Sequence, residues 1–333
     1  MEPPLENIIE LLNGYRISQA LSVAAQLRIA DHLANGSKAP DELAVLVSAQ
    51  AAPLYQVLRF CASYGIFVED DAGRFANTPM SECLRSDPPG AARNLALAIG
   101  HWNFQAFGEM KYAVQTGKPA FEKRFGRPFF DYLAAHQELG QIFDSLMTSL
   151  YQREVEATLE AFDFGSFGRI LDVGGGRGTV IRALLARFPE LRCGLFDLPA
   201  VAERARDNFS AEGLSKRCTI ETGSFFEAVP GGYDTYLLKH VLHDWDDAAC
   251  KIILTNIRRV IGNPGTLLIL EYIVPPGNER SAIKGQDMVM LSLLSGRERK
   301  ESEFRDLLAM TGFKLERVVP SNSLICVLEA KPA

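Results

Sequence analysis

One stretch of ten residues, 169–178, has the residue types of a ligand-binding turn: Arg-Ile-Leu-Asp-Val-Gly-Gly-Gly-Arg-Gly. Its apolar start predicts a buried parallel strand, and an apolar helical pattern follows over 180–188. Gly174, Gly176 and Gly178 carry no Cβ atoms that would keep a ligand from the backbone. The sequence therefore predicts a strand, a turn and a helix that together cradle a polar small molecule.

A second predicted strand, 193–196, ends on Asp197, about 20 residues after this turn. A carboxylate at that distance can accept hydrogen bonds from both hydroxyls of a ribose. The turn and the acid together indicate a cofactor that contains adenosine.

Three features distinguish between the cofactors that bind to such turns. The third small residue of the dinucleotide-binding pattern is missing, because Thr179 occupies its position. Asp172 precedes the glycines, and a carboxylate there favours a sulfonium cation. A predicted antiparallel hairpin at the end of the chain is atypical of dinucleotide folds. These features favour S-adenosylmethionine over nicotinamide and flavin cofactors.

Two histidines, His240 and His243, stand near the end of a later predicted strand. Alternation along an extended chain points them to opposite faces, so we expect no shared metal and a packed or exposed neutral ring at His240. His243 is expected at the carboxyl edge of the sheet, where ligands usually bind. Asp246 and Asp247 are expected to start a helix rather than to bind a cation.

Length and composition restrict the class of protein. The 333 residues suffice for two domains, and 47% are hydrophobic. A net charge of −6 gives no general attraction to nucleic acid or anionic membrane. The six cysteines are scattered, without metal-ligand spacing, and we interpret them as reduced core residues. No apolar run approaches the ~20 residues of a membrane span, and the start lacks a signal pattern, so a cytoplasmic protein is expected.

The first hundred residues predict a small helical domain with a winged-helix pattern. Residues 5–34 carry two opposed apolar faces at helical spacing, with a possible break at Gly14. Pro40 and Pro53 each open a short helix, and a two-stranded ribbon encloses the turn 69–73. Such a domain could bind DNA, but eleven acids against seven basic residues, with only Arg59 on the supposed recognition helix, oppose this. A subunit interface, and hence a homodimer, is favoured for 1–100.

Residues 101–165 are expected to form a helical segment that contributes to a substrate pocket, because pockets favour domain junctions. The segment is rich in aromatic residues, and each of these could equally belong to the core. The pocket candidates are Trp102, Phe107, Phe143 and Met147, together with Asp287 and Met290 further along the chain.

Residues 166–333 alternate between predicted strands and helices, which predicts an α/β domain with a doubly wound parallel sheet. A closing hairpin, with strands 314–319 and 323–329, adds antiparallel strands. The five parallel strands are expected at 170–173, 193–196, 218–221, 235–238 and 266–272.

Four motifs together resemble the small-molecule O-methyltransferases, a family that includes plant caffeic-acid and hydroxyindole enzymes and bacterial natural-product tailoring enzymes. The motifs are Leu-Asp-Val-Gly-Gly-Gly-Arg-Gly over 171–178, Phe-Asp-Leu-Pro over 196–199, Leu-Lys-His-Val-Leu-His-Asp-Trp over 238–245, and Gly-Arg-Glu-Arg over 296–299 with Glu303 and Phe304. The resemblance covers nearly the whole chain. It implies a winged-helix-like dimerisation domain followed by a Rossmann-like methyltransferase domain.

The resemblance also implies the residues that hold S-adenosylmethionine. Gly174 and Gly176 border its methionine part, Asp197 holds the ribose, Lys239 lies near its carboxylate and Trp245 packs beside adenine. We add Asp172, Leu198, Ser224 and Phe225 to this set. Ser224 departs from the family, which usually has Asp there, so it should hold the adenine amino group less strongly. Ser295 replaces the first glycine of a Gly-Gly pair, which leaves the conformation of that loop open.

By the same resemblance His243 is the general base, and Glu271 and Glu298 orient its imidazole. The charged run 297–301 alone would instead indicate solvated side chains. The leading hypothesis is S-adenosylmethionine-dependent O-methylation of a phenolic or polycyclic aromatic small molecule. Alternatives are N-methylation, decarboxylation or hydroxylation by a family member, and, in another class, a ligand-sensing DNA-binding regulator.

Overall fold

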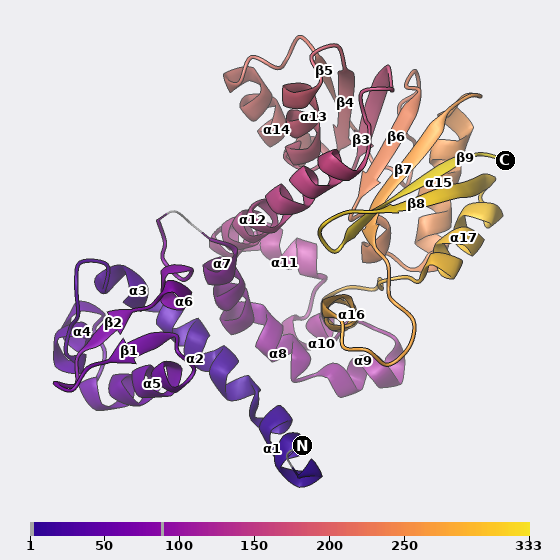
Figure 1. Ribbon diagram of the computed structural model, residues 1–333. Coiled ribbons are helices and arrows are strands. Elements are labelled where there is room, and N and C mark those ends of the chain that lie inside the picture. The colour runs from indigo at the N-terminus through magenta and orange to yellow at the C-terminus, as the bar shows by residue number, and fades with distance from the viewer. Residues whose placement is uncertain (1–2, 88–89) are drawn as a thin grey trace. The chain divides into compact units, whose positions relative to one another are not determined.

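The computed structural model describes residues 3–87 and 90–333, which form two compact units (Figure 1). The first unit comprises Met1–Glu109 and Lys123–Leu150, and the second comprises Met110–Glu122 and Tyr151–Ala333. The long helix α12 (Gln137–Ala161) contributes to both. Residues of the expected segment 101–165 thus occur in each unit, and the functional boundaries at 100 and 165 stay predictions.

The first unit begins with two nearly continuous helices, α1 (Pro4–Asn13) and α2 (Tyr15–Gln26). They are divided at Gly14, one of the two alternatives that the sequence offered, although Gly14 keeps helical dihedrals (φ −56°, ψ −25°). The small residues of α2 pack into the core of the unit. No residue of α1 is buried in the single chain.

Two helices and a hairpin follow, as the winged-helix pattern predicts: α4 (Pro40–Leu46), α5 (Ala51–Ser63), β1 (Phe67–Glu69) and β2 (Phe75–Asn77). α5 begins two residues before Pro53, which was expected to open it. Proline is tolerated there because the N–H groups of a first helical turn have no partner within the helix. The remaining helices of this unit are α3 (Ile29–His32), α6 (Pro79–Glu82), α7 (Ala91–Ala98), the π-helix η1 (Ile99–Asn103), α8 (Phe104–Phe107) and α11 (Phe129–Ala135).

The second unit contains a seven-stranded sheet in the order β5-β4-β3-β6-β7-β9-β8. The first five strands in this order are parallel, and β9 and β8 are antiparallel additions, which confirms the predicted sheet. The strands are β3 (Arg169–Val173), β4 (Arg192–Asp197), β5 (Cys218–Thr222), β6 (Thr235–Lys239), β7 (Thr266–Tyr272), β8 (Phe313–Pro320) and β9 (Ile325–Pro332). β9 begins two residues after the predicted start at Ser323, because Ser321 bonds across the connecting turn to Ile325.

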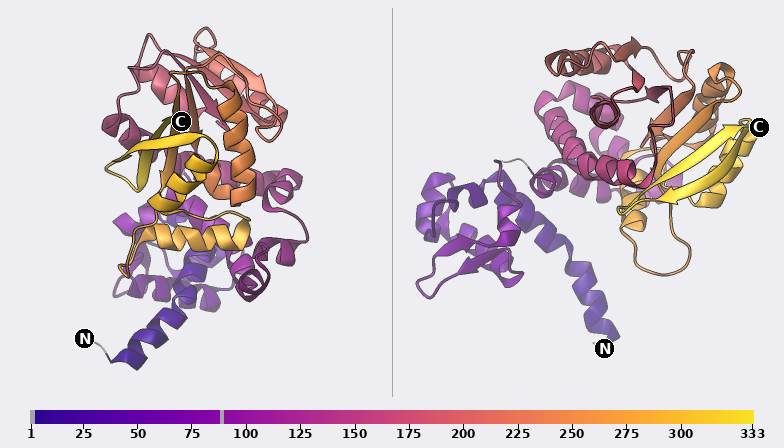
Figure 2. Two further views of the ribbon diagram at one scale, coloured as in Figure 1. Left: turned by 90° about the vertical axis from the view of Figure 1, so that its right-hand side faces the viewer. Right: turned by 45° about the horizontal axis from the view of Figure 1, so that its top comes forward.

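Alternate residues of the central strands belong to two cores, one on each face of the sheet. One face is covered by α15 (Asp247–Val260) and α17 (Glu301–Met310), and the other by the end of α12 with α13 (Thr179–Arg187) and α14 (Pro199–Ala211). Figure 2 shows these layers from two further sides. The other helices are α9 (Met110–Thr116), α10 (Ala120–Phe125), which crosses the division between the units, the 3₁₀ helix η2 (Leu242–Asp244) and α16 (Ala282–Leu293).

Parallel strands end along the same edge of a sheet, and this edge collects the predicted site residues. The glycine turn follows β3, Asp197 ends β4, His240 follows β6 and Glu271 lies near the end of β7. As predicted, Asp246 caps the following helix, where its side chain accepts a hydrogen bond from the Ala249 N–H at 2.8 Å.

Within the described ranges, no single helix has the length and apolar character needed to cross a membrane. The pair α4 and α5 meets the length and composition criterion only jointly and is bent by 112°.

Candidate active site

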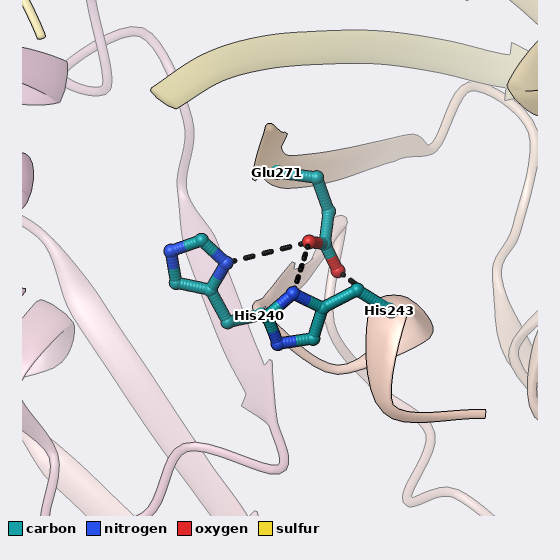
Figure 3. Close-up of side chains that lie close together, drawn as sticks. All are labelled: His240, His243 and Glu271. Carbon is teal, nitrogen blue, oxygen red and sulfur yellow. Dashed lines mark hydrogen bonds and ion pairs between the residues drawn. The ribbon is translucent and has the colours of Figure 1, made fainter. Parts of the chain in front are cut away.

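His243 is placed by a tight turn after β6. The strand ends at Lys239, His240 adopts a left-handed backbone with φ 50°, and η2 follows. The N–H of His243 donates to Glu271 Oε1 at 3.3 Å, and the residue is only 6% exposed. The turn therefore buries the imidazole against the end of β7 (Figure 3).

Three carboxylates face the His243 ring. Nδ1 lies 3.0 Å from Glu298 Oε1 and 3.5 Å from Glu271 Oε2, and Nε2 lies 3.4 Å from Asp244 Oδ1. Burial lowers the pKa of His243, but the charges of Glu271 and Asp244 and the contact with Glu298 outweigh it and raise the pKa to about 10. The ring of the protein alone is therefore a cation at neutral pH.

The contact with Glu298 assigns a proton to Nδ1, because an ionised carboxylate can only accept. Nε2 is then the ring nitrogen that can accept a proton once the imidazole is neutral. The arrangement of His243, Glu271 and Glu298 can serve general-base chemistry at Nε2.

Glu298 reaches His243 from the loop between α16 and α17. Its backbone N–H donates to Asp287 Oδ1 at 2.8 Å, and its side chain is 1% exposed. A Cβ atom on Gly296 would lie 1.9 Å from the carbonyl oxygen of His243. Glycine is therefore required at this position of the Ser-Gly pair, because only its backbone can approach the histidine turn so closely.

Arg299 is a site residue that the sequence analysis missed. It is 1% exposed and donates to the carbonyl oxygens of Leu242 at 2.7 Å and Trp245 at 2.9 Å. The same guanidinium bonds Asp247 Oδ1 at 2.8 Å. Arg299 thereby ties the loop of Glu298 to both ends of the histidine turn. Arg299 belongs to the Gly-Arg-Glu-Arg motif, but the run of alternating charges around it usually indicates solvent exposure.

The prediction that His240 and His243 point to opposite faces is wrong. Their rings stack with centroids 4.8 Å apart, and both lie beside Glu271 Oε2 (Figure 3). Alternation requires a continuous strand, and here the strand stops at Lys239 before the left-handed His240 and η2 redirect the chain. The His240 ring is packed, one of the two alternatives expected for it, and it also contacts two carboxylates, Glu271 and Glu154.

One ligand atom from each of His240, His243 and Glu271 lies within 4.8 Å of the others, and these are donor types that zinc accepts. In each imidazole, however, Nδ1 has a carboxylate oxygen at hydrogen-bonding distance: Glu271 for His240 and Glu298 for His243. We interpret the cluster as a hydrogen-bonded network.

Glu154, on the α12 segment of the second unit, is another residue that the sequence analysis missed. Its Oε2 lies 2.9 Å from Lys239 Nζ and 3.0 Å from His240 Nε2, and Tyr272 donates to Oε1. Burial alone would raise the pKa of Glu154, but His240 and then Lys239 lower it to about 2. Lys239, expected near the cofactor carboxylate, is therefore paired within the protein, over the ring of Tyr151.

The glycine turn exposes its backbone at Gly176, where an added Cβ would meet nothing within 4 Å. The Gly176 N–H donates to Asp197 Oδ2 at 2.8 Å, and the Leu198 N–H donates to Oδ1 at 2.7 Å. Asp197 is thus oriented beside the open part of the turn, and each of its oxygens can accept a further bond.

The other two glycines are needed for packing within the protein. A Cβ on Gly174 would lie 2.9 Å from Val241 Cγ2, and one on Gly178 would lie 2.3 Å from Phe209 Cε2. Packing within the protein therefore accounts for glycine at 174 and 178, whereas at Gly176 the space beside the backbone is open.

Asp172, beneath the same turn, is 1% exposed, and its Oδ2 has no hydrogen-bond partner among the residues that the structure describes. Burial, and secondarily the charge of Asp197, raises its pKa to about 7, while Lys239 opposes the shift. A buried carboxyl with an unused oxygen beside an open backbone fits a polar, positively charged cofactor.

Aromatic side chains follow β5 and β6 at the same sheet edge. Trp245 packs edge-on against Phe226 at 4.8 Å and Phe225 at 6.2 Å between ring centroids. Asn256 donates to the Phe225 carbonyl oxygen at 2.9 Å and so fixes this loop. The Ser224 hydroxyl accepts from the Phe226 N–H at 3.3 Å, so it closes its own turn.

The predicted pocket residues are divided between the two units. Trp102, Phe107, Phe143 and Met147 belong to the first unit, and Asp287 and Met290 belong to the second. Trp102 is 1% exposed and packs on Phe129, which also meets Phe143 edge-on. Asp287 is linked to Glu298 by the hydrogen bond described above.

Comparisons with known proteins agree with this arrangement. Residues 107–314 match the O-methyltransferase domain, and residues 9–87 match the O-methyltransferase dimerisation domain. The phenazine O-methyltransferase PhzM of Lysobacter antibioticus is 40% identical over 99% of this chain and 97% of its own length. The 8-amino-8-demethylriboflavin N,N-dimethyltransferase of Streptomyces davaonensis is 32% identical over 95% of this chain and 92% of its own.

A solved structure that resembles the chain is an O-methyltransferase from neocarzinostatin biosynthesis, in complex with S-adenosylmethionine and 2-hydroxy-5-methyl naphthoic acid. It is 31% identical, covers 96% of each chain and superposes with a TM-score of 0.87. The open glycine turn, Asp197 and the unpaired Asp172 oxygen fit the same cofactor. The chain therefore belongs to the S-adenosylmethionine-dependent O-methyltransferases of natural-product tailoring, with an N-terminal dimerisation domain.

Proposed function

We propose that this enzyme methylates a hydroxyl of a phenolic or polycyclic aromatic small molecule and that His243 removes the hydroxyl proton. The observation that carries the proposal is the geometry of His243. Its Nδ1 is bonded to Glu298, its backbone N–H is bonded to Glu271, and Nε2 remains as the nitrogen that can take a proton. Glu271 and Glu298 act by orienting this ring.

We further propose that the cofactor is held by Asp172, Gly174, Gly176, Asp197, Leu198, Ser224, Phe225, Lys239 and Trp245. When bound, S-adenosylmethionine supplies a methyl group on a sulfonium cation to an oxygen held in line with the bond from sulfur to carbon. Asp197 is available for the ribose hydroxyls, and Asp172, with one oxygen unpartnered among the described residues, is proposed to interact with the sulfonium cation.

The raised pKa of His243 affects how the proton is removed. A phenol with a pKa near ~10 cannot easily give its proton to an ordinary histidine near ~6.5. With its pKa at about 10, the base matches the phenol, but the ring must first lose its own proton. A cation bound nearby favours that loss, because like charges lower the pKa of an imidazolium.

The aromatic molecules named for similar proteins support a phenolic or polycyclic aromatic substrate. One similar protein is named for a phenazine, and another was solved in complex with a naphthoic acid, both planar aromatic molecules. We propose as substrate-contacting residues Trp102, Phe107, Phe143 and Met147 in the first unit and, separately, Asp287 and Met290 in the second.

We also propose a homodimer formed through the dimerisation domain. Apolar residues of α1 and the start of α2 are exposed in the single chain, among them Leu11 (73%), Leu12 (68%) and Tyr15 (52%). Exposed apolar surface of this extent is typical of an interface. Light scattering of the folded, active enzyme should give twice the mass of the chain, 36.7 kDa. A monomer at micromolar concentration would contradict this proposal.

The DNA-binding alternative can be tested in the same preparation, because an acidic domain should show no salt-sensitive, sequence-specific binding to duplex DNA. We also propose a cytoplasmic location, and the six free thiols agree with a reducing compartment.

Incubation with methyl-labelled S-adenosylmethionine and a panel of phenols, naphthols, hydroxyphenazines and the matching aromatic amines tests the reaction. We expect label transfer to oxygen in polycyclic phenols, located by mass spectrometry and NMR of the product. The N,N-dimethyltransferase among the relatives makes the amines the necessary comparison. Transfer to the amines alone would replace O-methylation by N-methylation.

A further inference from the structure

His240 occupies a position that the proposed mechanism does not use. Its ring lies between Tyr151, at 5.1 Å between centroids, and His243, at 4.8 Å, with Tyr272 edge-on at 4.7 Å. The residue is 6% exposed and keeps a left-handed backbone, which few residue types adopt readily. Packing on three sides and the fixed backbone hold the ring in one orientation.

Both ring nitrogens of His240 face carboxylate oxygens. Nδ1 lies 3.3 Å from Glu271 Oε2, and Nε2 lies 3.0 Å from Glu154 Oε2. Burial would raise the pKa of each carboxyl, but surrounding histidines, and Lys239 for Glu154, lower both, so both are ionised at neutral pH. An ionised carboxylate only accepts hydrogen bonds, so both nitrogens must carry protons for both contacts to form. The two contacts thus place the His240 ring between two carboxylates, with one ring nitrogen facing each.

His240 lies beside Glu271, the carboxylate that also contacts the proposed base His243. Glu271 Oε2 is shared between the two rings, 3.3 Å from His240 Nδ1 and 3.5 Å from His243 Nδ1 (Figure 3). The negative charge of Glu271 favours the protonated form of His243, which cannot accept a proton. A positive charge on the other side of Glu271 weakens that effect.

Building on the proposed function, we propose that His240 is a positioning residue for the methyl transfer. Its imidazolium, fixed by Glu154, holds Glu271 between the two rings and offsets its charge, so that His243 can become a neutral base. The two histidines thus have different roles: His240 holds Glu271 in place, and His243 accepts the proton.

The charged groups around His240 support its proposed role beside Glu271. The titratable groups that face it are Tyr151 and Glu154 from α12, Glu271 and Tyr272 from β7, and Lys239, His243 and Asp244 along its own segment. The Lys239 ammonium is bonded to Glu154, not to Glu271. Among the residues described, His240 is therefore the cation in contact with Glu271 besides the base itself.

The pH dependence of kcat/KM for a methylated phenol tests the proposal. His240→Asn suits the experiment because asparagine tolerates the left-handed backbone while it removes the charge. We expect the ascending limb of the profile to move to higher pH by roughly 1 to 2 units, with KM for the cofactor little changed. Glu154→Gln should move the limb in the same direction. His136→Asn, an exposed histidine in the first unit, is the matched control and should leave the profile unchanged.

If a folded, active His240→Asn variant keeps the ascending limb of its pH profile at the wild-type pH, the positioning role of His240 is wrong. If wild type methylates phenols and His243→Ala does not, such a result refutes only this inference, whereas full activity of His243→Ala refutes the proposed base.

Imidazole ¹⁵N NMR gives a second readout that does not require His240→Asn to fold. The chain has five histidines, so few signals have to be resolved. In His243→Gln, we expect one imidazole with both nitrogens protonated at pH 8, and we expect it to be lost when Glu154→Gln is added. Singly protonated rings only, at pH 8 in folded His243→Gln, would show that His240 is not the expected cation.

Discussion

The glycine turn after β3 and the histidine turn after β6 lie at the same sheet edge but are built differently. The first presents backbone groups and an open space at Gly176, and one oxygen of Asp172 has no partner within the described part of the chain. The second is a dense set of buried charges in which His243 contacts both Glu271 and Glu298. The difference indicates that the glycine turn is shaped to receive a cofactor, whereas the histidine turn keeps a proton acceptor in place.

Removal of the base should have the largest effect. His243→Ala should lower turnover by ~10² to 10⁴, the usual contribution of a positioned base. Cofactor affinity should change little, because the glycine turn and Asp197 lie on other strands. Single-turnover kinetics with a phenol substrate, and calorimetry with S-adenosylmethionine, measure the two effects separately.

The loss should shrink for a phenol that is already ionised at the assay pH, since no proton then has to be removed. Full turnover by His243→Ala on the true substrate at neutral pH would show that positioning alone carries the reaction.

The charged turn should also depend on Arg299 for its stability. Arg299→Met removes the charged donor to the carbonyl oxygens of Leu242 and Trp245 and leaves them only longer bonds, chiefly from the weakly donating Cys250 thiol, so the free energy of unfolding should fall by about 2 to 4 kcal/mol. Urea denaturation measures this free energy of unfolding. Arg297→Met is the matched control, because Arg297 is 41% exposed and its ion pairs should contribute at most about 1 kcal/mol. Equal losses in the two variants would contradict the structural role assigned to Arg299.

Acid should weaken the charged network through Glu154. Its pKa falls from 4.5 to about 2 on folding, so its contribution is fully present above pH 4.5 and is lost as the pH falls toward 2. The stability advantage of wild type over Glu154→Gln should therefore shrink over this window, by up to about 3 kcal/mol. Urea midpoints of both proteins between pH 5 and 3 provide the comparison. A constant difference would mean that Glu154 is not ionised in the native network.

A substitution beside the glycine turn should have a smaller effect, and the quantity that changes should be cofactor affinity rather than turnover or stability. Asp197→Ala should weaken S-adenosylmethionine binding by roughly 1 to 3 kcal/mol, because buried hydroxyls of the ribose would lose an acceptor. Turnover at saturating cofactor should stay close to that of wild type. A large loss of turnover with normal cofactor affinity would instead place Asp197 with the charged network.

Much of the glycine turn could be predicted because its signals are local. A short apolar run, three glycines and an acid at the end of the next strand predicted the β3 turn and the position of Asp197. The strand order and the closing hairpin followed from alternation and connection rules. Even here, the packing that requires glycine at 174 and 178 was not predicted, because the side chains involved, Val241 and Phe209, come from other elements.

The sequence by itself determined the sheet, the glycine turn and the place of His243, because these depend on short-range pattern. Only the tertiary structure decided the charged network. Glu154 meets Lys239 across 85 residues, and Glu298 meets His243 across 55. The burial of Arg299 and Glu298 could not be predicted from the charged run that contains them, because such a run by itself indicates solvent exposure. His240 joined His243 because a left-handed residue ended the strand, and a break of that kind depends on the packing around it rather than on residue alternation.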